Sequence, residues 1–70
     1  MTNPEQLRAL MRAHRLTRER VADILGVSLG AVRSWLADPK SASHRNMPDA
    51  MLRLLQWECG QLEKRDRLVN

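Results

Sequence analysis

Apolar residues recur at helical spacing in three short stretches of the first half of the chain. Each stretch follows a residue that favours the N-cap position of a helix, and these residues are Asn3, Thr17 and Ser28. Pro4 at the first helical position and Gln6 at the third support the first of these starts. The pattern predicts helices from Pro4 to about His14, from Thr17 to Gly26 and from Ser28 to about Ala37.

A longer apolar pattern follows Pro48 and predicts a fourth helix over about 48–66. Its apolar positions cover an arc of about 220° when successive residues are turned by about 100°. Packing on three small helices needs a stripe of only ~100°, so we expect the surplus surface to meet a second copy of the protein. The pattern does not decide whether residues 60–70 continue the helix or form a tail. The expected homodimer interface contains Met51, Leu52, Leu54, Leu55, Trp57 and Leu62.

Few residues favour strands, because Val, Ile and Thr are sparse outside the middle of the chain, and Gly and Pro number only 3 each. The 70 residues, 43% of them hydrophobic, suit one small domain over residues 1–70. We therefore expect an all-α bundle of four to five helices.

Metal and membrane binding are not expected. Cys59 is the only cysteine, and with His14 and His44 it offers too few well-spaced ligands for a zinc site. No stretch approaches the ~20 apolar residues that cross a bilayer, and the amino end has no apolar signal core. We expect a cytoplasmic protein without metal or other cofactor.

The charge balance favours a polyanionic partner. Lys and Arg number 12 against 8 Asp and Glu, which gives a formal net charge of +4 and a pI of about 10.6. Proteins that bind single strands or splayed RNA bases usually stack them on several aromatic side chains, whereas this chain has only Trp35 and Trp57. A double helix is therefore the favoured target.

The segment around Gly26 carries the clearest motif. Glycine suits the left-handed residue that ends a helix, so Gly26, Val27 and Ser28 form a predicted three-residue turn between two short helices. The run TRERVADILGVSLGAVRSWL resembles the helix-turn-helix of the Cro and lambda-repressor superfamily, also called XRE-type regulators. The positions that carry the resemblance are Ala22, Gly26, Val32 and Trp35.

A narrower resemblance extends beyond this motif. The stretches VSLGAVRSWLADP and MPDAMLRLLQW, with the basic loop around Arg45 between them, are similar to anti-CRISPR-associated phage regulators. The superfamily resemblance implies a small lambda-repressor-like bundle with its helix-turn-helix at 17–37. The narrower one implies a dimeric autorepressor that binds an inverted-repeat promoter site in a prokaryotic or phage-infected cell.

The outward positions of the third predicted helix are the expected base readers, namely Leu29, Gly30, Arg33 and Ser34. Arg33 is the strongest candidate, because its planar guanidinium can donate two hydrogen bonds to guanine. The alternatives for Arg33 are a phosphate contact and a solvated side chain. Ser34 suits a base edge or a phosphate. Leu29 suits a thymine methyl and the core equally well. Gly30 stands where the resemblance often has glutamine, and either lets the backbone approach DNA or merely weakens the helix.

Phosphate contacts are expected from two regions. The resemblance implies that the amino end of the second helix, with Thr17 and Arg18, faces the DNA backbone. Ser28, at the start of the third helix, is a further expected phosphate contact. The loop after the third helix either follows the neighbouring strand or is simply solvated, and its candidates are Lys40, Ser43, His44 and Arg45. A further basic stripe, expected to be solvated, is Arg8, Arg12 and Arg15.

Two other function classes compete with a DNA-binding regulator. A helical protein-interaction module, such as an antitoxin-like partner-binding domain, would use the same wide apolar arc against another protein. An enzyme is disfavoured, because no carboxylate pair, nucleophile–base arrangement or phosphate-cradling glycine loop stands at a useful spacing.

Overall fold

The computed structural model describes the backbone of residues 2–69 and the side chains of residues 2–64. This part of the chain forms four α-helices and no strand, which confirms the all-helical class. The helices are α1 (Asn3–His14), α2 (Arg18–Leu25), α3 (Leu29–Leu36) and α4 (Asp49–Val69).

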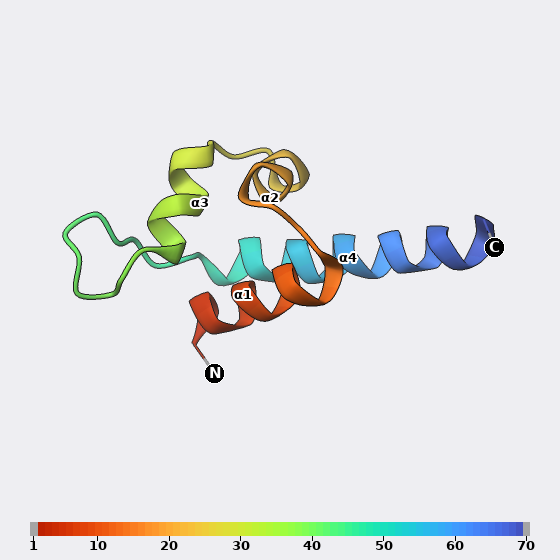
Figure 1. The fold of residues 1–70 in the computed structure, drawn as a ribbon, viewed down its shortest axis with the longest axis horizontal. Coiled ribbons are helices and arrows are strands. Elements are labelled where there is room, and N and C mark those ends of the chain that lie inside the picture. The colour runs from red at the N-terminus through yellow and green to blue at the C-terminus, as the bar shows by residue number, and fades with distance from the viewer. Residues whose placement is uncertain (1, 70) are drawn as a thin grey trace.

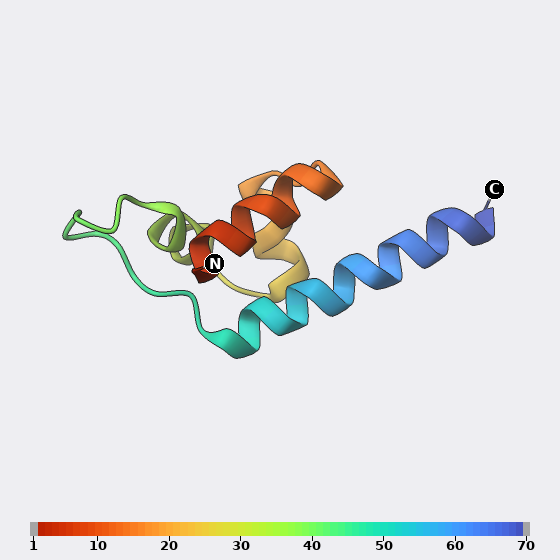
Figure 2. The ribbon, with the colours of Figure 1, turned by 90° about the horizontal axis from the view of Figure 1, so that it is seen from below.

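The long helix α4 forms one side of the molecule. The helices α1 and α2 pack along its first half, and α3 packs against α2 and α1 (Figures 1 and 2). Both α2 and α3 lie to one side of α4, whereas α1 lies along α4 itself (Figure 1). The loop 37–48 projects at the end of the molecule opposite the carboxyl terminus (Figure 2). This arrangement leaves α3 at the outside of the bundle, next to that loop.

The start of α1 differs from the prediction by one residue. Thr2 is the N-cap: its hydroxyl accepts from the backbone N–H of Glu5 at 3.4 Å, and the Glu5 carboxylate accepts from the Thr2 N–H at 3.1 Å. The prediction of Asn3 as cap was therefore wrong. The Asn3 amide instead donates to the carbonyl of Met47 at 2.9 Å and to Oδ1 of Asp49 at 2.6 Å, which ties the start of α1 to the start of α4.

The predicted turn between α2 and α3 is confirmed. Gly26 adopts the left-handed conformation with φ 67°, and the N–H of Val27 donates to the carbonyl of Ala22 at 3.1 Å. Thr17 and Ser28 cap the two helices as expected, because each hydroxyl accepts a backbone N–H of the first turn at 3.1 Å.

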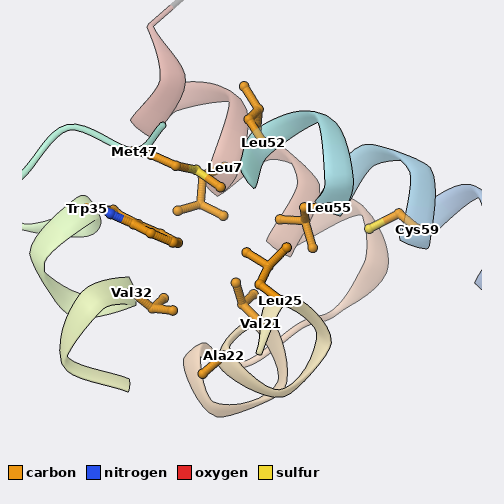
Figure 3. Close-up of a cluster of buried hydrophobic side chains, with 10 residues drawn as sticks. All are labelled: Leu7, Val21, Ala22, Leu25, Val32, Trp35, Met47, Leu52, Leu55 and Cys59. Carbon is orange, nitrogen blue, oxygen red and sulfur yellow. The ribbon is translucent and has the colours of Figure 1, made fainter. Parts of the chain in front are cut away.

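All four helices and the loop contribute to one apolar core. Among residues 2–64, whose side chains are described, it contains ten buried side chains, with Leu7, Val21, Val32 and Leu55 each 0% exposed (Figure 3). Burying a side chain of this size contributes roughly 1.5–3 kcal/mol to stability. The core is completed by Ala22, Leu25, Trp35, Met47, Leu52 and Cys59.

The fourth helix continues without a break through Gly60, and its backbone stays helical to Val69. The question of a tail over residues 60–70 is thus answered as far as Val69, while Asn70 and the side chains of Leu68 and Val69 lie outside the described residues. Among the described residues, no helix is both long enough and apolar enough to cross a bilayer.

Candidate nucleic-acid interface

The two faces of α3 differ sharply. Val32 and Trp35 point into the core, where Val32 is 0% and Trp35 6% exposed (Figure 3). Gly30 and Arg33 lie on the opposite side and are exposed. The spacing of apolar residues predicted this division, because residues three apart share a face of a helix.

Arg33 is the most available of the predicted base readers. It lies in the last turn of α3, and its side chain makes no hydrogen bond or ion pair with any other described residue. Its five N–H donors are therefore free for a ligand. Leu29 and Ser34 are half-buried, which leaves each with only part of its side chain at this surface.

The amino ends of α2 and α3 carry the predicted phosphate contacts. Thr17 and Ser28 are exposed, and each uses its hydroxyl oxygen as an acceptor for its own helix. The hydroxyl proton remains free to donate, because a serine or threonine hydroxyl combines one donor with two acceptor lone pairs. Arg18 is the first residue of α2 and is exposed. These side chains can bind an anion together with the free backbone N–H groups at the helix N-termini.

The loop after α3 places its basic residues in two different ways. Lys40 is exposed, and so is Ser43, whose hydroxyl lies 2.8 Å from that of Ser41. Arg45 is exposed, but its Nη1 donates to the carbonyls of Ala42 and His44, at 3.0 and 2.9 Å. The guanidinium is thus held against its own loop by one nitrogen, with Nε and Nη2 left over.

His44 does not fit its predicted role as a phosphate contact. The side chain is half-buried, with Nδ1 3.1 Å from the carbonyl oxygen of Ala37 and Nε2 3.2 Å from Oδ1 of Asn46. Both ring nitrogens are occupied within the chain, so the imidazole holds the loop together rather than facing a ligand.

Arg8 has a partner that the sequence did not reveal. The basic stripe on α1 was expected to be solvated, but Nη2 of Arg8 donates to the carbonyl of Leu36, at the end of α3, at 2.8 Å. These residues stand 28 positions apart. Neither helical spacing nor local turn chemistry signals a contact at that separation.

Five of the six residues of the predicted dimer surface divide into three groups. Leu52 and Leu55 are 5% and 0% exposed inside the core of one chain, so their assignment to a partner surface needs correction. Met51 packs against the same core and is half-buried. Leu54 and Trp57 are 37% and 60% exposed and form the part of the prediction that stays at the surface.

Leu62, also half-buried, lies elsewhere on α4. It lines an open hollow of about 640 Å³ between the end of α1, the start of α2 and α4. His14 and Glu63 border the same hollow, with His14 Nε2 3.7 Å from Glu63 Oε1. Leu62 therefore belongs to this hollow and not to the Leu54–Trp57 surface.

Cys59 is a packing residue of the core. Its side chain is 1% exposed, and burial raises the pKa of the thiol, with the Glu63 and Glu58 carboxylates adding to the rise. A thiol held neutral in this way is a poor nucleophile. Among the residues whose side chains are described, no group of three or more His, Cys, Asp or Glu gathers as a metal would require.

In the comparisons with known proteins, the chain matches no protein-family model, no curated protein and no solved structure.

Proposed function

We propose that the protein is a sequence-specific transcriptional regulator that binds double-stranded DNA through a lambda-repressor-like helix-turn-helix formed by α2 and α3. The observation that carries this proposal is the outer face of α3, where Arg33 is exposed and has no partner among the described residues. A free guanidinium on an outward helix face is suited to a base edge, because the major groove admits an α-helix.

Specificity and affinity come from different residues in this proposal. Arg33 donates two hydrogen bonds to guanine O6 and N7, a contact worth about 1–3 kcal/mol of discrimination. Thr17, Arg18 and Ser28 hold the phosphates on either side, which fixes the register of α3 without reading sequence. Lys40 and the unused nitrogens of Arg45 extend this contact along the backbone.

The regulator acts as a homodimer in this proposal. The exposed pair Leu54 and Trp57 is an apolar surface on α4 that a second copy would cover. A two-fold dimer presents two copies of α3 to an inverted repeat whose half-sites lie about 34 Å, or a multiple of that, apart. Occupying a promoter in this way represses transcription by blocking access to it.

A protein-interaction module is the second candidate function, and the 60% exposure of Trp57 favours it. Tryptophan is enriched among the residues that dominate protein interfaces. In that case another protein, rather than a second copy, covers Leu54 and Trp57, as in an antitoxin-like domain.

Selection from a random duplex pool, followed by a salt titration of the selected duplex, distinguishes the two functions. A DNA-binding regulator recovers one inverted-repeat sequence, and its affinity falls steeply with salt, by roughly 0.9 log units per log unit of salt for each phosphate contacted. Recovery of no common sequence, with a salt-insensitive affinity for a protein partner, would instead support the interaction module.

A further inference from the structure

The three short helices end in different ways. α1 and α2 end at left-handed residues, Arg15 with φ 54° and Gly26 with φ 67°. In each, the residue after the cap donates its N–H back to a carbonyl of the last turn, at 2.8 and 3.1 Å. α3 ends at Ala37, which is extended with φ −66° and ψ 158°. The chain leaves α3 without turning back, because Pro39 disfavours helical geometry just beyond it.

Donors from outside the helix take the place of that return bond. Nη2 of Arg8 donates to the carbonyl of Leu36 at 2.8 Å, and Nδ1 of His44 lies 3.1 Å from the carbonyl oxygen of Ala37. A carbonyl only accepts, so Nδ1 carries the proton in this bond. A cationic donor such as Arg8 is also favoured beside the negative end of the helix dipole.

The loop that carries His44 is fixed to the same helix end by its backbone. The N–H of Arg45 donates to the carbonyl of Ser34 at 3.0 Å. Three carbonyls of the last turn of α3 and its cap are thus satisfied, one by α1 and two by the loop. All three donors come from outside the helix, in addition to the core packing of Trp35.

We propose that Arg8 and His44 are positioning residues for the DNA-binding face of α3. They hold the turn that carries Arg33 against α1 and the loop, and they act without touching DNA. This role rests on the proposed function, and it reassigns two residues whose polar side chains alone suggest a solvated position or a phosphate contact.

The binding test compares Arg8→Met and Arg8→Lys with Arg12→Met, a matched control on the same helix whose arginine is exposed. Arg8→Met is expected to weaken binding to the selected duplex about tenfold, the loss of one charge-assisted hydrogen bond. Binding to an unrelated duplex and the salt slope should match those of Arg12→Met. Lysine keeps a donor of similar reach, so Arg8→Lys should recover most of the lost affinity.

Two outcomes of this test would overturn the role of Arg8. If Arg8→Met weakens both duplexes equally and lowers the salt slope by about one relative to Arg12→Met, Arg8 binds a phosphate. If Arg8→Met leaves the preference for the selected duplex unchanged, the contact with Leu36 does not position the reading face.

The second test needs no DNA. Amide hydrogen exchange in His44→Ala is expected to speed the Arg45 N–H about tenfold or more while the amides of α2 keep their rates, because local opening exposes only the released segment. Ser43→Ala, in the same exposed loop, is the control and should leave the Arg45 amide protected. Equal exchange in the two variants would overturn the capping role of His44. Failure of the wild-type protein to select any duplex would overturn the proposed function, and this measurement would still report on the cap.

Discussion

At the scale of single residues, the three glycines of the chain illustrate different energetic roles. Gly26 has φ 67°, in the region where side-chain-bearing residues are strained. Gly60 lies inside α4 in ordinary helical geometry, and an added Cβ there would meet nothing within 4 Å. Gly30 is also helical, and its Cβ would lie 3.8 Å from the Ser28 hydroxyl, an ordinary contact.

Alanine at positions 26 and 60 should therefore change stability in opposite directions. Gly26→Ala is expected to lower the free energy of unfolding by about 1 kcal/mol through backbone strain alone, since the Cβ meets no atom within 4 Å. Gly60→Ala is expected to raise it by roughly 0.5–1 kcal/mol, because alanine is the better helix former. Urea denaturation of both variants measures the difference, and a stabilised Gly26→Ala would contradict the described turn.

Gly30 separates folding from binding. Gly30→Ala should stabilise the fold by roughly 0.5–1 kcal/mol, since the helix can accept the methyl group. If the backbone of α3 approaches DNA closely, the same methyl should weaken binding to the selected duplex. Thermal denaturation and duplex titration of the one variant measure both effects, and unchanged affinity would show that no close approach occurs at this position.

Cys59 reports on the integrity of the core. Burial raises the pKa of its thiol. In the unfolded chain the thiol begins to ionise near its ordinary pKa of ~8.5, whereas the folded protein keeps it neutral at that pH. The resulting contribution to stability is present below that pH and is lost as the pH rises. We expect thiol-reagent labelling to be at least ~100-fold slower in the native protein than in denaturant, with the free energy of unfolding declining above about pH 8.5. Fast labelling of the native state would contradict the burial of Cys59.

At the scale of helices, the sequence predicted most of what local chemistry decides. Both ends of α2 and the start of α3 follow from Thr17, Gly26 and Ser28, whose capping preferences act within a few residues. The start of α1 was misplaced because Asn3 also favours the N-cap. Its amide is instead held by Met47 and Asp49, a contact across the chain that no local pattern contains.

The candidate site, too, was predictable only where local helical spacing decides the position of a side chain. Arg33 lies on the outer face of α3 because helical spacing fixes which residues point outward. The roles of Arg8 and His44 were not predictable, since both depend on how α1 and the loop meet the end of α3. Their polar side chains suggested an outward orientation, whereas unsatisfied carbonyls at the helix end draw both side chains back to the protein.

At the scale of the whole molecule, the apolar arc of α4 is wider than one core can cover, as predicted. The sequence did not show which part of the arc faces the core and which part stays exposed. Leu52 and Leu55 face the core, while Leu54 and Trp57 are left at the surface. Neighbouring residues of α4, such as Leu54 and Leu55, differ in whether they are exposed or buried. The rotation of α4 about its own axis decides this, and only the packing of α1 and α2 against α4 fixes that rotation.

Substitutions on these two sides should have separate effects. Trp57→Lys is expected to convert a dimer to a monomer in sedimentation velocity. It should change the stability of the isolated chain by no more than ~0.5 kcal/mol, since the side chain is 60% exposed. Leu52→Ala, the control, should cost about 2–5 kcal/mol because it opens a cavity in the core. A Trp57→Lys protein that sediments like the wild type would exclude this surface from self-association.

The most direct measurement of the central claim is the discrimination between the selected duplex and a scrambled duplex by Arg33→Ala, with Arg12→Ala as a charge-matched control. The account predicts that Arg33→Ala folds normally and loses about 1–3 kcal/mol of discrimination per half-site, while Arg12→Ala keeps it. An Arg33→Ala protein with undiminished preference for the selected duplex would contradict reading of DNA by α3.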